Sequence, residues 1–526
     1  MTELVFYVVS DVHGYIFPTD YQQAHQSLPM GLLQAKQTID LDRLQHDHTL
    51  LIDNGDFLQG SPFCSFLSSH LNSSQPLTDI YNDMGFDVGI IGNHEFNFGM
   101  RYLKDTLQQL NYPVLCENIL INDQPFTGEG VTYIKKAGVQ IGVIGLTTQF
   151  IPNWEQPQHI KNLTFESAKQ GLQRVLPKVR QQADIVVVCY HGGFEKDIHT
   201  GASTELLTGE NEGYDLLTEF EGIDVLITGH QHQTIAEVIN GIPVIQPGTK
   251  GQHVGKITLD ITESSVSNMD KVGAHHATNK HVVRHAKSEL LPVTGKHPLI
   301  LTDVQKSLES DVENWLDTKI ATLNQPMCID DHFEARKQPH PFINLLNYIL
   351  LEASGADISS TALFDTATGF DRTVTMRDVI NNYPFPNTFN VLAMTGHEIK
   401  ASIEKSAAYF DFENGEVIVS PTSIKPKPQH FNYDMYGGIY YEIHVNAPVG
   451  DRVKNILFKG EPMDMSATYT IVLNNYRAVG GGGYTMFSSD KIVKDIQVEG
   501  AQLIIDYLAQ HPDVNVPNVT DFKVLK

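Results

Sequence analysis

The chain of 526 residues is poor in several features that would assign it to particular classes of protein. It has four cysteines, which are widely spaced and form no CxxC pair, at Cys64, Cys116, Cys189 and Cys328. We therefore expect reduced, mostly buried thiols, as in a cytoplasmic protein. Basic residues are also scarce, with 37 lysines and arginines against 62 acidic residues, which gives a net charge of −25. This charge argues against non-specific binding to nucleic acid or to an anionic membrane surface.

Long apolar runs and a recognisable leader are missing as well. No stretch approaches the ~20 apolar residues of a membrane span. The N-terminus leads from Met1 directly into the apolar run 4–9, without a basic leader or a small-residue cleavage site. We expect a cytoplasmic protein unless a leader has been removed. Its expected partner is a small molecule rather than a membrane or a nucleic acid polymer, and its expected state is a monomer or weak dimer.

The length predicts two or three domains, because a single hydrophobic core stops growing well below 526 residues. Strand-like apolar runs and helical stretches alternate through the first half of the chain, as in a βαβ sheet. The run 184–190 is almost continuously apolar, which is typical of a strand buried on both faces. The first half is therefore predicted to be an α/β domain.

Polar side chains recur where the predicted strands of this half end. Asp and His at positions 11 and 13 follow the first strand, and a GNHE run follows the strand over 86–91. Each such residue can be a polar turn, a helix cap or a satisfied loop histidine. Five strand ends with glycine nearby are better explained by a shared site, since α/β sheets bind ligands at their carboxyl ends. The candidates are Asp11, His13, Asp56, Asn93, His94, His191, His230 and His232.

These eight side chains offer oxygen and imidazole ligands but no thiolate. Such a set suits Mn, Fe, Zn, Co or Ni rather than a structural zinc ion bound by cysteine. Eight ligands are too many for one four-coordinate ion. The sequence therefore predicts two divalent metal ions, roughly 3.5–4 Å apart and bridged by a shared carboxylate.

The composition changes over 262–298, which is rich in Ser, His, Lys and Asn. A surface hairpin or loop is the favoured interpretation, although histidines such as His275 and His276 leave metal binding as an alternative. An amphipathic helix is predicted over 299–323, as a connector to a second domain. That domain should contain helices over 342–354, from 375 and from 394, and strands over 439–445 and 470–473.

Four consecutive glycines at 480–483 stand between aromatic residues inside the second half. They predict close backbone approach or unusual backbone angles, either in a ligand-contacting loop or in a flexible linker. The run lacks the strand and the GK[ST] context of a P-loop, so we do not predict an ATPase site.

The first half resembles the calcineurin-like metallophosphoesterases in five motifs, which lie at 11–13, 55–56, 92–95, 191–193 and 229–232. The second half resembles the C-terminal domain of the 5′-nucleotidase family in the motifs at 383–387, 395–400 and 474–484. The resemblance implies an α/β (α+β) architecture in three parts. These are a four-layer α/β/β/α catalytic domain over 1–298, a connecting helix and linker over 299–330, and an α/β nucleotide-binding domain over 331–526.

The resemblance also implies roles for single residues. The first metal would be held by Asp11, His13, Asp56 and His232. The second would be held by Asp56, Asn93, His191 and His230, with Asp56 bridging. His94 would be the catalytic histidine near the phosphoryl group. Substrate would be bound by Asn387, by Phe431 and Tyr476 as an aromatic pair around the base, and by Gly481 and Gly482; Tyr433 competes with Phe431 for its place.

One position favours a particular branch of the family. Many 5′-nucleotidases have Asp where this chain has Asn97, and the NHEFNFG form is similar to bacterial 2′,3′-cyclic-nucleotide 2′-phosphodiesterase/3′-nucleotidases. This resemblance implies hydrolysis of 2′,3′-cyclic nucleotides to 3′-nucleotides and on to nucleoside and phosphate, by a hydroxide that bridges the metals. The alternatives are a 5′-nucleotidase, a nucleotide-sugar hydrolase, and a non-catalytic nucleotide-binding module.

Overall fold

The computed structural model describes residues 2–526 except His25, Trp154, Leu206, 264–280, Pro386, 426–427, Gln497 and Pro512. The chain forms two compact units, Met1–Val312 and Glu313–Lys526. The boundary between them lies inside a helix, α7 (Asp303–Leu316), and within the segment 299–330 predicted to connect two domains.

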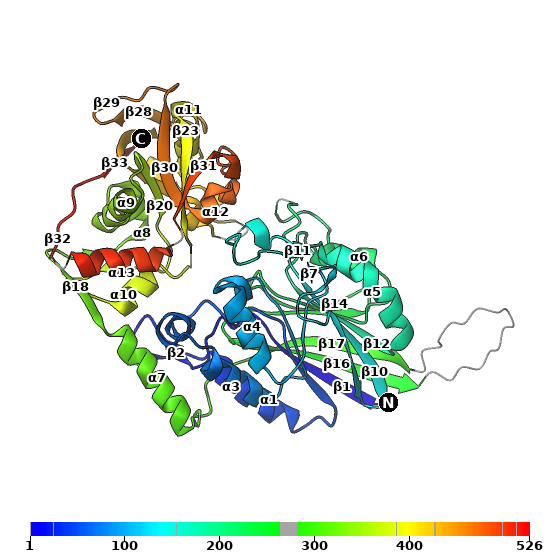
Figure 1. Ribbon diagram of the computed structural model, residues 1–526. Helices are drawn as coiled ribbons and strands as arrows, with labels where there is room; N and C mark the ends of the chain where they lie inside the picture. Colours follow the sequence, from blue (N-terminus) through cyan, green and yellow to red (C-terminus); the bar gives the residue numbers. More distant parts are fainter. Residues whose placement is uncertain are drawn as a thin grey trace. The chain divides into compact units, whose positions relative to one another are not determined.

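Two six-stranded sheets form the centre of the first unit (Figure 1). The first sheet has the order β17 (His281–Pro292), β16 (His253–Glu263), β1 (Thr2–Val9), β4 (Thr49–Asp53), β5 (Val88–Ile90), β6 (Val114–Leu115). The second has the order β14 (Thr234–Ile239), β15 (Ile242–Pro247), β13 (Val225–Thr228), β12 (Ile185–His191), β10 (Val139–Thr147), β9 (Val131–Lys136). Strands β1, β4, β5 and β6 are parallel to one another, and so are β10, β12, β13 and β15.

The alternation of side chains along β12 shows how the layers are held together. Ile185, Val187 and Cys189 belong to a core cluster that both sheets share. Val186, Val188 and Tyr190 face the opposite way, into a cluster with helices α5 (Ala168–Gln182) and α6 (Gly213–Glu219). A strand with apolar residues on both faces therefore lies between two layers, as its sequence predicts.

Helices cover the outer face of the first sheet as well. Tyr7 on β1 donates a hydrogen bond from its hydroxyl to Asp42 of α1 (Leu32–Arg43) at 2.6 Å. Figure 1 shows α3 (Gln75–Met84) and α4 (Gly99–Gln109) beside α1. The predicted four-layer α/β/β/α arrangement is thus observed, with an apolar cluster between the two sheets and another between the second sheet and its helices.

The segment 299–323 differs from its prediction as a single helix. Helix α7 ends at Leu316, and Lys319–Leu323 forms a strand, β18, paired with β22 (Thr373–Thr375). The apolar positions of the helix are unequally buried, since Val312 and Leu316 are fully buried whereas Val304 is 78% exposed. Periodicity alone overestimated the helix because the last part of the segment pairs as a strand in a sheet.

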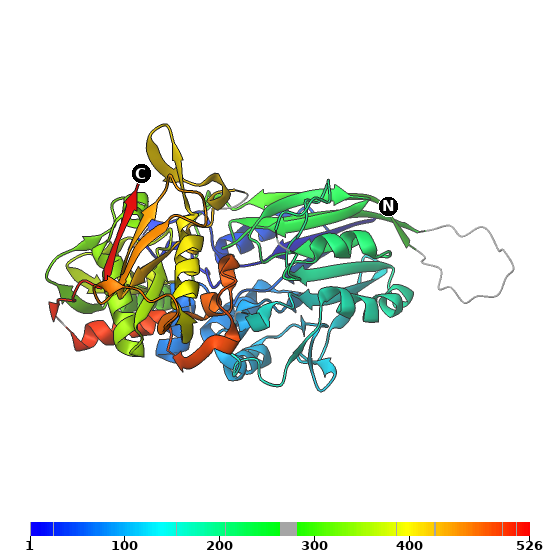
Figure 2. The same cartoon turned by 90° about the horizontal axis from the view of Figure 1, so that it is seen from above.

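The surface hairpin predicted over 262–298 is confirmed for the described part of the segment. Its described C-terminal part forms the edge strand β17, which pairs with β16 over its whole length (Figure 2). The metal-binding alternative for His275 and His276 falls on positions outside the described residues. The hairpin is therefore an extension of the first sheet.

The second unit contains a five-stranded sheet in the order β26 (Asp434–Gly437), β20 (Ile358–Ala362), β30 (Thr468–Asn474), β23 (Phe389–Thr395), β31 (Ile492–Ile496). A four-stranded sheet has the order β29 (Glu461–Pro462), β28 (Val453–Phe458), β27 (Ile439–His444), β33 (Thr520–Leu525). Its helices include α9 (Pro341–Ser354), α10 (Met376–Asn382), α11 (Gly396–Ala407) and α13 (Gly500–Gln510). The helices predicted at 342–354, from 375 and from 394 and the strands predicted at 439–445 and 470–473 are confirmed, although the third helix begins at Gly396.

Three of the four cysteines are buried, whereas Cys328 is exposed, and all four are free thiols. The prediction of reduced, mostly buried thiols is confirmed in this respect. Among the helices of the described residues, none combines the length and the apolar character that crossing a membrane requires.

Candidate functional site

The predicted ligands come from the carboxyl ends of strands in both sheets of the first unit. Asp11 and His13 follow β1, Asp56 follows β4, and Asn93 and His94 follow β5, all in the first sheet. His191 is the last residue of β12, and His230 and His232 follow β13, both in the second sheet. The stacking of two sheets therefore brings together residues that are 221 positions apart in sequence (232 − 11).

Five of these residues have backbone angles that side chains usually avoid. The φ angles of Asp11, His13, Asp56, His230 and His232 lie between 52° and 67°, in the left-handed region. Such angles cost of order 1–3 kcal/mol each and persist where the surroundings enforce them. The turns after β1, β4 and β13 therefore carry strain in order to aim their side chains.

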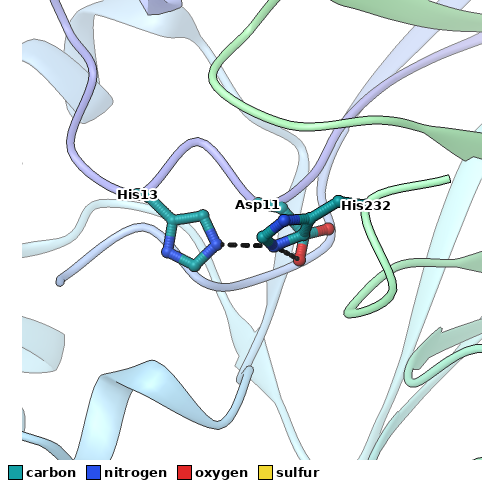
Figure 3. A group of neighbouring side chains, drawn as sticks. All are labelled: Asp11, His13 and His232. Carbon is teal, nitrogen blue, oxygen red and sulfur yellow. Dashed lines mark hydrogen bonds and ion pairs between the residues drawn. The ribbon is translucent and has the colours of Figure 1, made fainter. Parts of the chain in front are cut away.

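Asp11, His13 and His232 form the first of three groups of candidate metal ligands (Figure 3). His13 Nε2 lies 3.0 Å from His232 Nε2, which in turn lies 3.5 Å from Asp11 Oδ1. The other ring nitrogen of His13, Nδ1, lies 2.8 Å from the carbonyl oxygen of Gln59 and donates to it. This bond leaves Nε2 with a lone pair that points toward the other two ligands.

Asp56, His191 and His230 form a second group. His191 Nε2 lies 3.1 Å from Asp56 Oδ2 and 3.8 Å from Asp11 Oδ1. His191 Nδ1 donates to the carbonyl oxygen of Asn54 at 2.6 Å. Asn93 belongs to the same place, because its Oδ1 lies 2.9 Å from His230 Nδ1.

Asp56 joins the two groups. A third group contains Asp56 together with His13 and His94, and Asp56 Oδ2 lies 3.9 Å from His13 Nε2. Its other oxygen, Oδ1, accepts a hydrogen bond from the backbone N–H of His94 at 2.8 Å. A carboxylate between two sets of imidazoles is the arrangement expected of a bridging ligand.

The charges of these groups are set by burial and by one another. Burial lowers the pKa of His13 to about 3, even though Asp56 opposes the shift, so His13 is neutral. Burial also disfavours the charged form of His191, but Asp56 and Asp11 outweigh it and raise the pKa of His191 to about 10. Burial would raise the pKa of Asp56, yet His191 and His94 hold that pKa well below its usual range.

The residues fit a dimetal centre. Asp11, Asp56 and His191 are at most 1% exposed, and burying such charges requires compensation. His191 Nε2 is buried and has no hydrogen-bond partner of good geometry among the described residues, so this nitrogen can ligate a cation once it has lost its proton. Carboxylate, amide and imidazole ligands suit divalent transition metals.

Glu95 is a buried residue of this site to which sequence reasoning gave no role. Its carboxylate accepts hydrogen bonds from the backbone N–H groups of Gly92, Asp56, Phe57 and Leu58, at 2.6 to 3.1 Å. It therefore ties the turn after β4 to the turn after β5. The NHE motif was a signal for it, since a buried glutamate needs donors within reach.

In the second unit the aromatic candidates sit on two short helical segments, His430–Asn432 and α12 (Asn475–Ala478), which Arg477 joins. Arg477 Nη1 donates to the carbonyl oxygen of Gly481 at 2.5 Å, and Nη2 donates to that of Phe431 at 3.2 Å. Asp434 pairs with the buried guanidinium at 2.9 Å. Phe431 and Tyr476 are half-buried, whereas Tyr433 is fully buried against Tyr409. Of the two candidates for this position, Phe431 therefore has an exposed surface and Tyr433 does not.

The glycine run has the unusual backbone predicted for it. Gly480, Gly482 and Gly483 have φ angles of 96°, 71° and 77°. A Cβ on Gly481 would lie 2.4 Å from the carbonyl oxygen of Tyr476. The loop containing Asn387 adjoins the same region, because the carbonyl oxygen of Thr388 accepts from the backbone N–H of Asn475 at 2.9 Å.

Comparison with known proteins places both units. Residues 4–234 match the model of the calcineurin-like phosphoesterases, and residues 319–489 match the 5′-nucleotidase C-terminal domain. A crystal structure from Staphylococcus aureus, provisionally named a 5′-nucleotidase and in complex with alpha-ketoglutarate, is 55% identical. It superposes with a TM-score of 0.92 over 100% of both chains.

Two curated relatives are more distant. The 2′,3′-cyclic-nucleotide 2′-phosphodiesterase/3′-nucleotidase of Salmonella typhimurium is 26% identical, over 90% of this chain and 80% of its own length. The trifunctional nucleotide phosphoesterase YfkN of Bacillus subtilis is 25% identical, over 96% of this chain. The chain spans 38% of the length of that relative.

Proposed function

The chain belongs to the calcineurin-like phosphoesterases that carry a 5′-nucleotidase C-terminal domain, and we propose that it hydrolyses 2′,3′-cyclic nucleotides. The family as such consists of hydrolases of nucleotide phosphoesters with a dimetal centre. The proposed products are first a 3′-nucleotide and then nucleoside and phosphate. The observation that carries the proposal is the His94–Asn97 pair beside the ligand cluster, because the NHEFNFG form that contains it resembles that of the cyclic-nucleotide phosphodiesterases.

Two divalent ions would supply an activated water near neutral pH and would neutralise charge on the phosphoryl oxygens. The residues that would hold them are Asp11, His13, Asp56 and His232 for one ion, and Asp56, Asn93, His191 and His230 for the other. Manganese is the proposed identity to test first, because imidazole and carboxylate ligands both accept it.

His94 is the proposed catalytic residue. Its Nδ1 lies 2.6 Å from Asn97 Oδ1, and its backbone N–H is held by Asp56 at 2.8 Å. Nδ1 is engaged in this way, so Nε2 is the ring atom that can donate a proton to the leaving oxygen. In the first hydrolysis, water forms a P–O bond, the P–O2′ bond breaks, and O2′ takes up a proton.

Hydrolysis of 5′-nucleotides is the second candidate. It is supported by the Staphylococcus aureus structure, whose provisional name is 5′-nucleotidase and which matches the whole chain. The same metal ligands and the same aromatic loops would serve both substrates, because every nucleobase offers a π-face. The two candidates differ in which oxygen of the sugar leaves.

A substrate panel tests the proposal. Purified protein reconstituted with Mn²⁺ would be assayed against 2′,3′-cyclic AMP, 3′-AMP, 5′-AMP and a UDP-sugar. We expect the highest kcat/KM for the cyclic substrate and accumulation of 3′-AMP before phosphate appears. A preference for 5′-AMP by more than tenfold would instead support the second candidate. Hydrolysis of none of the four would contradict both.

A further inference from the structure

A line of hydrogen bonds leads from His94 away from the predicted ligands. Asn97 Oδ1 lies 2.6 Å from His94 Nδ1, and Asn97 Nδ2 donates to Glu155 Oε2 at 2.7 Å. The other oxygen of Glu155, Oε1, lies 2.8 Å from Nδ1 of His159. These contacts join the turn after β5 to the loop after β10, a strand whose end carries no predicted metal ligand.

The chemistry of Glu155 determines how the Asn97 amide is turned. An ionised carboxylate accepts hydrogen bonds and cannot donate them, so it pairs with the NH₂ end of the amide. The carbonyl oxygen of Asn97 must then face His94, where it accepts from Nδ1. Glu155, which contacts Asn97 and not His94 itself, thus determines that His94 Nδ1 carries the proton donated to Asn97.

Glu155 itself is held firmly. Its side chain is only 6% exposed, in a setting where a charge acts more strongly than in water. Its Oε1 also accepts from the backbone N–H of Gln156 at 2.8 Å, and its own backbone N–H donates to Ile151 at 2.9 Å. His159 packs over Gly99, at the start of α4.

We propose that Glu155 is a positioning residue for His94 and acts through the amide of Asn97. The inference rests on the proposed function, in which His94 donates a proton to the leaving oxygen. In this arrangement the neutral amide of Asn97 lies between His94 and the negatively charged carboxylate of Glu155. Between the two residues, the amide of Asn97 donates and the carboxylate of Glu155 accepts. Placing the carboxylate at position 97 and the amide at position 155 reverses this direction.

Exchange of the two side chains is the decisive experiment. Asn97→Asp alone sets two carboxylates against each other and removes the Nδ2 donor, so we expect kcat for 2′,3′-cyclic AMP with Mn²⁺ to fall about tenfold. Adding Glu155→Gln supplies an amide donor to Asp at 97, whose other oxygen accepts from His94. The double variant should regain a kcat within about threefold of the wild type.

Further variants separate positioning from a structural role. Glu155→Ala should lower kcat about tenfold with KM changed less than twofold, and Mn²⁺ content should stay as in the wild type. Glu166→Gln is the matched control, since Glu166 is a half-buried glutamate paired with Arg174. It should leave kcat unchanged. Thermal unfolding of every variant shows whether a loss of activity follows a loss of folded protein.

The outcomes distinguish this inference from the proposed function. A wild-type protein that hydrolyses none of the panel substrates contradicts the proposed function. An active wild type in which Glu155→Ala keeps full kcat contradicts the role of Glu155 alone. Failure of Glu155→Gln to rescue Asn97→Asp, with both variants folded and metal-loaded, also overturns the inference. Rescue supports it, because a residue that only braced the loop would add its damage to that of Asn97→Asp.

Discussion

His191 is the residue whose charge must change most when a metal binds. In the metal-free protein Asp56 and Asp11 outweigh the effect of burial and raise its pKa to about 10, so its ring is protonated at pH 7.5. A protonated imidazole cannot ligate a metal. Mn²⁺ binding must therefore displace a proton from His191, whereas His13, with a pKa of about 3, is already neutral.

We accordingly predict that metal removal and rebinding are linked to protons. At pH 7.5, Mn²⁺ binding to the metal-free protein should release about one proton from His191, and the affinity should rise as pH approaches 10. The folding stability of the metal-free protein depends on pH in the opposite direction to the metal affinity. The stability contributed by charged His191 is complete below its unfolded pKa of ~6.5 and is lost as pH rises through about 10.

Calorimetric titration in two buffers of different ionisation enthalpy measures this proton release. The His191→Ala variant is the control, because it removes the proton donor along with the ligand and should release less. Binding of Mn²⁺ by the wild type without any proton release at pH 7.5 would show that His191 is neutral before the metal arrives.

At the scale of elements, the site depends on how closely the turns after neighbouring strands approach. A Cβ on Gly92, in the turn after β5, would lie 2.2 Å from Asp56 Oδ1 and 2.6 Å from the Asp56 backbone nitrogen, in the turn after β4. These separations are far below van der Waals contact. Glycine at position 92 is therefore required for Asp56 to lie within reach of both His13 and His191.

Gly92→Ala should therefore weaken Mn²⁺ binding at least tenfold, because Asp56 must move, while β4 and β5 remain paired. Metal content after dialysis against a limiting Mn²⁺ buffer measures the loss. Gly241→Ala is the control, since nothing lies within 4 Å of the Cβ position of Gly241, and only its own φ of 84° opposes a side chain there. It should cost about 1–2 kcal/mol of stability and retain the metal. Equal metal content in both variants would refute the argument.

The sequence predicted the strand ends well because their signal is local. Apolar runs that stop at Asp11, Asp56, His191 and His230 are visible without any tertiary information. It could not show that β1, β4 and β5 lie in one sheet and β12 and β13 in another, since pairing joins residues far apart in sequence.

The sequence also contained no indication of residues that act through another side chain, because their contacts join positions far apart in the chain. Glu155 lies 58 positions from Asn97, in a loop without a motif, and Glu95 was read only as part of NHE. Arg477 stood in a recognised motif, but its bond to Phe431, 46 positions away, needed the fold. The buried Tyr433 and the half-buried Phe431 likewise became distinguishable only through packing.

For the whole molecule, the candidate metal ligands and the candidate base-binding residues belong to different units. Substitutions in the second set are therefore expected to change KM without changing kcat. The candidate metal ligands all belong to the unit Met1–Val312, and the aromatic candidates Phe431 and Tyr476 belong to the unit Glu313–Lys526. A net charge of −25 gives no general attraction for an anionic nucleotide, so binding must come from local contacts. Stacking on a nucleobase contributes about 1–3 kcal/mol per base.

Tyr476→Ala should thus raise KM for 2′,3′-cyclic AMP by about tenfold and change kcat little. It should leave the hydrolysis of glycerol 1,2-cyclic phosphate unaffected, because this substrate has the cyclic diester but no base. Steady-state loss of the cyclic diester, followed by ³¹P NMR or by chromatography of the monoester product, measures both. Tyr440→Ala is the control, since Tyr440 is a half-buried tyrosine of the same unit that bonds to Glu442 at 2.7 Å. Equal losses on both substrates would mean that Tyr476 supports the fold of its loop, against Gly481, rather than the base.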